Sequence, residues 1–230
     1  MTEEEGATGE GPGRSERAEE PGRFERDGRD GRAERHERVG RSGRDGRSGP
    51  RERDGVELRP ARPEDAAAVA RIWHAGWSDG HLGHVPGALL AVRTPESFAL
   101  RAPRRVEDTV VAVVAGEIAG FVMVVDDEVE QVYVAADHRG TGVAPALLAE
   151  AERVVAAKGH RRAWLAVVDG NARARRFYER NGWRDEGLFE YLAASDSGPI
   201  RVSCHRYVKP VTAPGPHLPG PHLPGVIAPE

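Results

Sequence analysis

A strand, a glycine-rich turn and a helix follow one another without a break between residues 131 and 148, and this unit constrains the fold more than any other stretch of the chain. Val132 and Val134 alternate with Gln131 and Tyr133, which is the pattern of a strand that buries one face. After the turn, apolar residues recur at spacings of four and three, which predicts a helix from about Gly142 to Lys158. An α/β fold organised around this unit is therefore expected.

The turn itself, residues 139–144, is a candidate anion site. A helix that opens on glycines directs unpaired N–H groups and the positive end of its dipole at one spot, and phosphate is the natural ligand there. The turn lacks the Lys-Ser/Thr ending of a P-loop and the third glycine of a dinucleotide motif. It resembles the Arg/Gln-x-x-Gly-x-Gly/Ala motif of the GCN5-related N-acetyltransferase superfamily, with Arg139, Gly142 and Ala144 on the defining positions. A glycine at a helix start also has a purely local explanation.

A second motif points to the same superfamily. Residues 171–183 read N-A-R-A-R-R-F-Y-E-R-N-G-W, which predicts a helix capped by Asp169 or Asn171 and ended by Asn181-Gly182. The segment is similar to the last helix of these acetyltransferases, Asn-x-x-Ala-x-x-Phe-Tyr-Glu-x-x-Gly-Phe/Trp. Two motifs in the right order carry more weight than one, and the resemblance extends over residues 55–209.

The remaining elements give the fold class. Strands over 109–114, 118–125 and 128–134 are separated by short turns, so they are antiparallel. The apolar run 163–168 follows the central helix, so it should lie parallel to the strand before that helix. Closing strands are expected over 188–192 and 200–208. We therefore predict a mixed, mostly antiparallel sheet flanked by helices, the acyl-CoA N-acyltransferase type of fold that the resemblance implies.

The segment from residue 55 to residue 105 supplies a first strand near Val56 and two helices. One starts at Pro63 and carries Trp73 and Trp77 on its apolar face, and a shorter one spans residues 95–105. We read these tryptophans as core residues, although Trp77 and the following loop could border a substrate pocket. His74, His81 and His84 lie nearby, but no carboxylate stands at ligand spacing beside them, so no metal site is expected.

The resemblance implies acetyl-CoA as donor and places it between the two parallel strands. Their backbone would pair with pantetheine, the amides of the turn would bind the pyrophosphate, and the second motif would add two further contacts. The implied cofactor-binding residues are Val132, Tyr133, Val134, Arg139, Gly140, Thr141, Gly142, Val143, Ala144, Asn171 and Tyr178.

Acetyl transfer to an amine needs a neutral nucleophile, a donor to the developing oxyanion and a proton for the departing thiolate. The motif position of Tyr178 implies that this phenol supplies the proton, whereas a merely packed phenol is the alternative. Glu128 and Glu130 share strand parity with Val132 and Val134, so either carboxylate could face the acetyl group and act as the base. Alternatively, these acidic residues belong to a solvated turn and have no role in catalysis.

The two ends of the chain differ from its middle. Residues 1–54 consist largely of Arg, Gly, Glu, Asp and Ser, and residues 210–230 are rich in Pro and Gly, so both are expected to be disordered. The first could be a solvated tail or an arm that touches nucleic acid, but its interleaved acids cancel most of the charge. The net charge of −4, the absence of a membrane-length apolar run and the single Cys204 favour a cytoplasmic protein without a membrane partner.

The sequence thus predicts an acetyl-CoA-dependent N-acetyltransferase that acts on a primary amine by direct attack in a ternary complex. The sequence does not decide whether the acceptor is a small molecule or a peptide. It also does not decide whether the protein is a monomer or a homodimer. The alternative is a domain that binds or senses CoA without turnover, with the Arg-rich arm as an interaction segment.

Overall fold

The computed structural model describes residues 51–53 and 55–212. In chain order its elements are β1 (Arg51–Arg53), β2 (Val56–Pro60), η1 (Pro63–Asp65), α1 (Ala66–His81), α2 (Gly87–Val92), α3 (Pro95–Arg101), η2 (Ala102–Asp108), β3 (Thr109–Val114), β4 (Glu117–Val125), β5 (Glu128–Val134), η3 (Ala136–His138), α4 (Val143–Ala157), β6 (Arg162–Val168), α5 (Ala172–Arg180), β7 (Arg184–Ala193) and β8 (Ile200–Pro210). The elements η1, η2 and η3 are 3₁₀ turns.

One sheet of eight strands forms the centre of the domain. Its order is β1-β2-β3-β4-β5-β6-β8-β7, and every neighbouring pair is antiparallel except β5 and β6. The antiparallel run β3–β4–β5 follows from short turns, and Ala115 and Gly116 take the positive φ angles of 51° and 85° that a tight hairpin requires. The crossover through α4 makes β6 parallel to β5, as the sequence predicts. The predicted fold class is confirmed.

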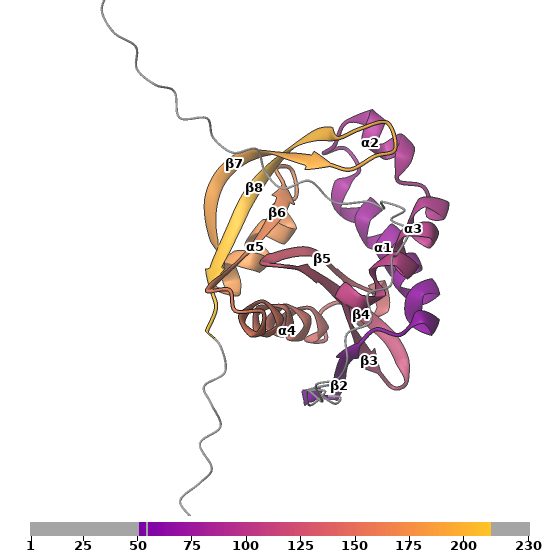
Figure 1. The fold of residues 1–230 in the computed structure, drawn as a ribbon, viewed down its shortest axis with the longest axis vertical. Coiled ribbons are helices and arrows are strands. Elements are labelled where there is room, and N and C mark those ends of the chain that lie inside the picture. The colour runs from indigo at the N-terminus through magenta and orange to yellow at the C-terminus, as the bar shows by residue number, and fades with distance from the viewer. Residues whose placement is uncertain (1–50, 54, 213–230) are drawn as a thin grey trace, which may run out of the picture.

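Helices cover the two faces of the sheet. Figure 1 shows α1, α2 and α3 grouped on one side of β5 and α4 on the other. The core on the first side is built on Trp73, Phe98 and Phe121, and the core on the second side on Leu147, Leu165 and Tyr207. The predicted assignment of Trp73 and Trp77 to the core is confirmed, since they are 2% and 7% exposed.

The central helix α4 forms where its sequence pattern predicts. Gly142 precedes it with φ 91°, a left-handed conformation that a side chain would strain, and Gly159 follows it with the same φ. Val143, Leu147, Ala151 and Val155 recur on one face of the helix and are completely buried. The packing of this face fixes the N-terminus of α4 close to the end of β5, from which the glycine turn leads.

The structure differs from the sequence-based expectation at several boundaries. The helix expected over residues 95–105 ends at Arg101 and continues as η2, and α2 is a helix that no sequence pattern predicted. Strand β1 pairs with β2 inside the segment expected to be disordered, and Pro210 closes β8 opposite Arg162 rather than starting a tail. Residues 1–50, 54 and 213–230 lie outside the described residues. Within the part of the chain that the structure describes, no helix has the length and apolar character needed to cross a bilayer.

Gly120 lets β5 and α4 approach β4. A Cβ built at this position would lie 2.7 Å from the carbonyl oxygen of Tyr133 and 3.0 Å from Cδ1 of Leu147. Because backbone cannot yield as a flexible side chain does, we expect Gly120→Ala to reduce the free energy of unfolding by about 1–3 kcal/mol in urea denaturation. The control is Gly87→Ala at the start of α2, where a Cβ meets no atom within 4 Å. Equal stability of the two variants would contradict this account.

Candidate active site

A cavity of about 660 Å³ opens where β5 and β6 separate. Its walls come from both parallel strands, from the turn before α4, from α5 and from helices α1–α3. The cavity therefore passes through the sheet plane and reaches both helical layers. Most of the residues that the sequence singled out lie around it.

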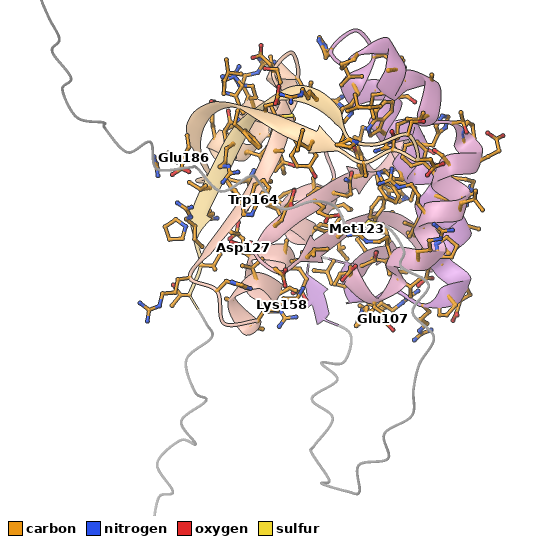
Figure 2. The ribbon with its side chains drawn as sticks, turned by 45° about the horizontal axis from the view of Figure 1, so that its top comes forward. Glu107, Met123, Asp127, Lys158, Trp164 and Glu186 are labelled. Atoms are coloured by element: carbon orange, nitrogen blue, oxygen red, sulfur yellow. The ribbon has the colours of Figure 1, made fainter. Side chains whose placement is uncertain are left out.

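The two parallel strands pair at only one place. Glu128 is in register with Trp164, and next to them the backbone N–H of Trp164 donates to the carbonyl oxygen of Asp127 at 3.0 Å. The indole Nε1 of Trp164 also donates to Oδ1 of Asp127 at 3.2 Å, and Figure 2 shows these two side chains close together at this closed end. Beyond it the strands diverge, so that the edges of residues 132–134 and 166–168 face the cavity.

The predicted anion-binding turn lies at one mouth of the cavity. Gly140 and Gly142 have φ of 81° and 91°, and a Cβ on either would meet no atom within 4 Å, so the backbone here is open to a ligand. Arg139, Gly140, Gly142 and Ala144 line the cavity, whereas the side chain of Thr141 donates to the carbonyl oxygen of His138 at 2.7 Å and that of Val143 is buried in the core. The first turn of the 15-residue helix α4 points its N–H groups toward this space.

Arg139 forms an ion pair across the mouth. Its Nη2 lies 2.7 Å from Oδ2 of Asp79, at the end of α1, and the two side chains are 37% and 48% exposed. An exposed pair of this kind contributes little to stability. A phosphate at the turn would therefore compete with Asp79 for Arg139 at small cost.

A β-bulge in β5 overturns the expectation that Glu128 and Glu130 share a face with Val132 and Val134. Val132 pairs with Val122 and Gln131 with Met123, but Val124 pairs with Val129, which leaves Glu130 as the extra residue. Val132 and Val134 pack in the core beneath α4. The strand parity used in the sequence analysis is wrong because one inserted residue reverses it.

Both carboxylates have defined partners on the α1–α3 side or on β7. Glu128 Oε1 accepts a hydrogen bond from the hydroxyl of Tyr191, on β7, at 3.3 Å. Glu130 pairs with Arg105, of η2, at 2.5 Å, and its side chain is only 7% exposed. Both residues line the cavity. Glu130 is thus fixed in an almost buried ion pair, and Glu128 contacts the phenol of Tyr191.

Two tyrosines from different elements, Tyr133 and Tyr178, line the cavity. Tyr178 comes from α5 and packs against Phe177 and Trp183, with ring centroids 5.2 and 6.1 Å away. Burial raises the pKa of Tyr178, so its phenol stays protonated well above neutral pH. Burial also raises the pKa of Tyr133, and proximity to Tyr178 raises it further. Both phenols are therefore neutral proton donors inside the cavity.

Asn171 links α5 to the cavity. Its Oδ1 accepts from the N–H of Ala174 at 3.0 Å and caps the helix, as one of the two predicted caps. A Cβ on Gly80 would lie 3.0 Å from Asn171 Nδ2, so the absent side chain at Gly80 lets α1 approach this loop. The start of α5 therefore lies next to α1 at Gly80.

Sequence reasoning missed the cavity residues on α2, α3 and β7. Arg93, Arg101 and Tyr191 line the cavity, and no motif distinguishes them among the other arginines and tyrosines of the chain. His81 also lines it and stacks on Trp77 at 4.7 Å. Within residues 51–53 and 55–212, no three His, Cys, Asp or Glu side chains are grouped to hold a metal ion.

Comparison with known proteins places these features in a family context. Residues 71–183 match the model of a family described as Acetyltransferase (GNAT) family. Uncharacterized N-acetyltransferases of Mycobacterium bovis and Mycobacterium tuberculosis are 35% identical over 77 residues, which cover 31% of this chain and 49% of theirs. The match thus spans about half the length of these curated relatives.

Solved structures share the fold. A GCN5-related N-acetyltransferase of Rhodopseudomonas palustris aligns with a TM-score of 0.53 and 22% identity, covering 74% of this chain and all of the other. An acetyltransferase of Salmonella typhimurium, solved with its cofactor acetyl-CoA, aligns with a TM-score of 0.50 and 16% identity, covering 76% and 98%. At these identities the likeness concerns the arrangement of strands and helices.

Proposed function

The domain that contains residues 71–183 belongs to the acetyltransferase (GNAT) family, and from this premise we propose that the protein transfers an acetyl group from acetyl-CoA to a primary amine by direct attack in a ternary complex. The observation that carries the proposal is that two structural features open onto the same cavity. The parallel strands separate after a single register pair, and the glycine turn at the start of α4 opens onto the same space. A reducing, cytoplasmic location is part of the proposal, supported by the single Cys204.

The residues around the cavity fit acetyl-CoA in shape and in chemistry. The open backbone at Gly140 and Gly142, with the N–H groups that begin α4, suits a pyrophosphate. The edge of residues 132–134 faces the cavity where no strand pairs with it, so its polar backbone suits the amide groups of pantetheine. In this proposal Arg139 turns from Asp79 to the pyrophosphate, and Asn171 and Tyr178 contact the cofactor from α5.

The proposed chemistry is one displacement. The amine nitrogen attacks the thioester carbonyl, the C–N bond forms and the C–S bond breaks, which gives an amide and the CoA thiolate. Glu128 accepts the proton that the ammonium must lose before attack, directly or through a water molecule, and Tyr178 donates a proton to the thiolate. The second proton, which the nitrogen loses as the amide forms, restores the phenol of Tyr178. A backbone N–H near Val132 stabilises the oxyanion that develops on the carbonyl.

Glu128 is the stronger of the two candidate bases. Glu130 is held by Arg105 in a pair that is nearly buried, so its charge is already balanced. Glu128 lines the cavity, where its Oε1 accepts a hydrogen bond from the hydroxyl of Tyr191 at 3.3 Å.

Acetyl-CoA is expected to raise the melting temperature by roughly 5 to 10 °C. A ligand that binds only the folded state at a hundredfold excess over its Kd stabilises by about 2.7 kcal/mol, which corresponds to this shift for a domain of this size. Thermal denaturation with and without millimolar acetyl-CoA measures it, and NADH, which shares the pyrophosphate but has no pantetheine, serves as the control. An unchanged melting temperature would refute the cofactor assignment.

Release of free thiol in the presence of amines then separates an enzyme from a domain that only senses CoA.

A further inference from the structure

The end of helix α1 reaches across the cavity between the separated strands. A Cβ built on Gly76 would lie 2.3 Å from Cδ1 of Tyr133, so α1 lies directly against β5 at this point. About one turn later, a Cβ on Gly80 would lie 3.0 Å from Nδ2 of Asn171, which precedes α5. Gly76, Gly80 and His81 all line the cavity. This part of α1 therefore extends from β5 to the start of α5, and His81 is the titratable side chain that it contributes to the cavity wall.

The imidazole of His81 is held in one plane and in one tautomer. It stacks on Trp77, with ring centroids 4.7 Å apart and ring planes 7° from parallel. Its Nδ1 lies 2.9 Å from the carbonyl oxygen of Trp77. Because a carbonyl oxygen can only accept a hydrogen bond, Nδ1 carries the proton and donates it here. In the neutral ring the lone pair is therefore on Nε2.

The neutral ring is the form present at pH 7. Burial lowers the pKa of His81, the hydrogen bond to the Trp77 carbonyl opposes this only in part, and the charges of Arg93 and His84 lower the pKa further. Nε2 makes no hydrogen bond to any residue that the structure describes, yet it is not among the buried side-chain atoms without a partner. Solvent therefore reaches Nε2, which is an open hydrogen-bond acceptor in the wall of the cavity.

Charge alone does not orient a substrate in this cavity, because side chains of both signs line it. Arg93 follows α2 and Arg101 lies on α3, whereas the carboxylates of Glu128 and Glu130 come from β5. Their opposite charges offset one another at the scale of the whole site. The orientation of an amine therefore depends on individual hydrogen-bond partners, and the lone pair of His81 Nε2 is one of them.

We propose that Nε2 of His81 accepts a hydrogen bond from the amino group of the acceptor and holds its nitrogen toward the thioester. The inference rests on the acetyl transfer proposed above and adds an acceptor-binding residue to the same cavity. The reacting ammonium has three N–H bonds, and one proton passes to Glu128 before attack. One of the two N–H bonds that remain donates to His81, which leaves the lone pair of the nitrogen free for the carbonyl carbon.

This contact gives the cavity a preference for primary amines. A primary amine keeps one N–H when it becomes an amide, so its hydrogen bond to His81 persists from the bound acceptor to the product. A secondary amine loses its last N–H as the amide forms, which leaves Nε2 without a donor. A hydrogen bond that is lost during the reaction raises the barrier. N-methylation of an acceptor should therefore lower kcat/KM, and part of this loss should depend on His81.

The test measures thiol release from acetyl-CoA by the full chain, with each amine compared with its N-methyl derivative. The probes are 2-phenylethylamine, L-leucine and 1,4-diaminobutane. For the pair that reacts best, we expect His81→Asn to lower kcat/KM of the primary amine about tenfold or more and that of the N-methyl derivative less. Asparagine keeps a donor for the Trp77 carbonyl but has no atom at the place of Nε2. His81→Gln reaches that place with an amide oxygen and should retain more activity.

The matched control is His74→Asn, the same change on the same helix. The ring of His74 lies 5.6 Å from that of Phe98 and is not part of the cavity wall, so kcat/KM should not change. Melting temperature and CoA affinity show whether each variant is folded. An unchanged kcat/KM in His81→Asn, or an equal loss for the primary amine and its N-methyl derivative, would overturn the proposal.

Nitrogen-15 NMR of the histidine rings tests the contact without turnover. At pH 7 the spectrum of His81 should show the proton on Nδ1, and the Nε2 resonance should move upfield when ethylamine is added at saturating CoA. A proton on Nε2, or a resonance that does not move, would overturn the role of His81. A moving resonance without thiol release from any amine would keep this contact and overturn acetyl transfer, whereas thiol release that His81→Asn leaves unchanged would do the reverse.

Discussion

Tyr178→Phe is expected to lower kcat for acetyl transfer by roughly one to four orders of magnitude, while folding and CoA affinity change little. The ring that packs against Phe177 and Trp183 is kept, and only the hydroxyl is lost. Because burial raises the pKa of this phenol, the proton is present at every pH at which the protein is assayed near neutrality. CoA thiolate is a tolerable leaving group, so the loss should fall toward the lower end of the range. Steady-state kinetics at saturating acetyl-CoA measure it.

The matched control for this change is Tyr207→Phe. Tyr207 is completely buried and its ring lies 6.0 Å from that of Tyr178, but its hydroxyl donates to Glu179 at 2.9 Å instead of lining the cavity. Loss of this bond should reduce stability by about 1 kcal/mol and leave kcat unchanged. If Tyr178→Phe retained full kcat, the phenol would have no part in the reaction even with acetyl transfer established.

Glu128→Gln is expected to lower kcat/KM near pH 7 by about a hundredfold and to move the rising limb of the pH profile to higher pH. Without the carboxylate the acceptor must arrive already neutral, and below the pKa of an amine its neutral fraction grows tenfold with each pH unit. The amide of glutamine still accepts from the hydroxyl of Tyr191, so the geometry around the position should persist. Initial rates from pH 6 to pH 10 give the profile.

Glu130→Gln is the comparison variant, because it tests the other candidate base. Removing this charge takes one carboxylate partner from Arg105, whose Nε also lies 3.1 Å from Oδ2 of Asp108. We expect a loss of stability but a pH profile with its rising limb unmoved. A profile that shifts for Glu130→Gln and not for Glu128→Gln would exchange the roles of the two residues.

Local sequence signals predicted the parts of the fold that local geometry determines. Gly142 and Gly159 bound α4 because the left-handed backbone at a helix end favours glycine, and this preference is visible in one chain. The cap at Asn171 and the hairpin at Gly116 are short-range signals of the same kind. The apolar repeats of α1 and α4 likewise predicted which faces are buried.

Features that depend on contacts between distant segments escaped prediction. The bulge at Glu130 arises in the pairing of β5 with β4, and the alternation of residues in β5 gave no sign of an extra residue. Arg101 reaches the cavity because α3 packs beside α1, Arg93 reaches it from the end of α2, and a lone arginine carries no pattern. The part of the cavity beside α2 and α3 was therefore invisible in the sequence, whereas the glycine turn before α4 was not.

The single register pair between β5 and β6 divides the sheet into two leaves. Glu128 and Tyr133 belong to the leaf that contains β5, and Tyr178 lies on α5, which follows β6 in the other leaf. The leaves are joined by their common packing against α4 and by contacts such as the hydrogen bond from Tyr191 to Glu128, and the distance from base to acid depends on the angle between them. In the proposed function, pantetheine bridges the gap and sets the angle, so the donor completes the catalytic geometry before the acceptor can react. If acetyl transfer proceeds as proposed, we expect an ordered kinetic scheme in which acetyl-CoA binds first.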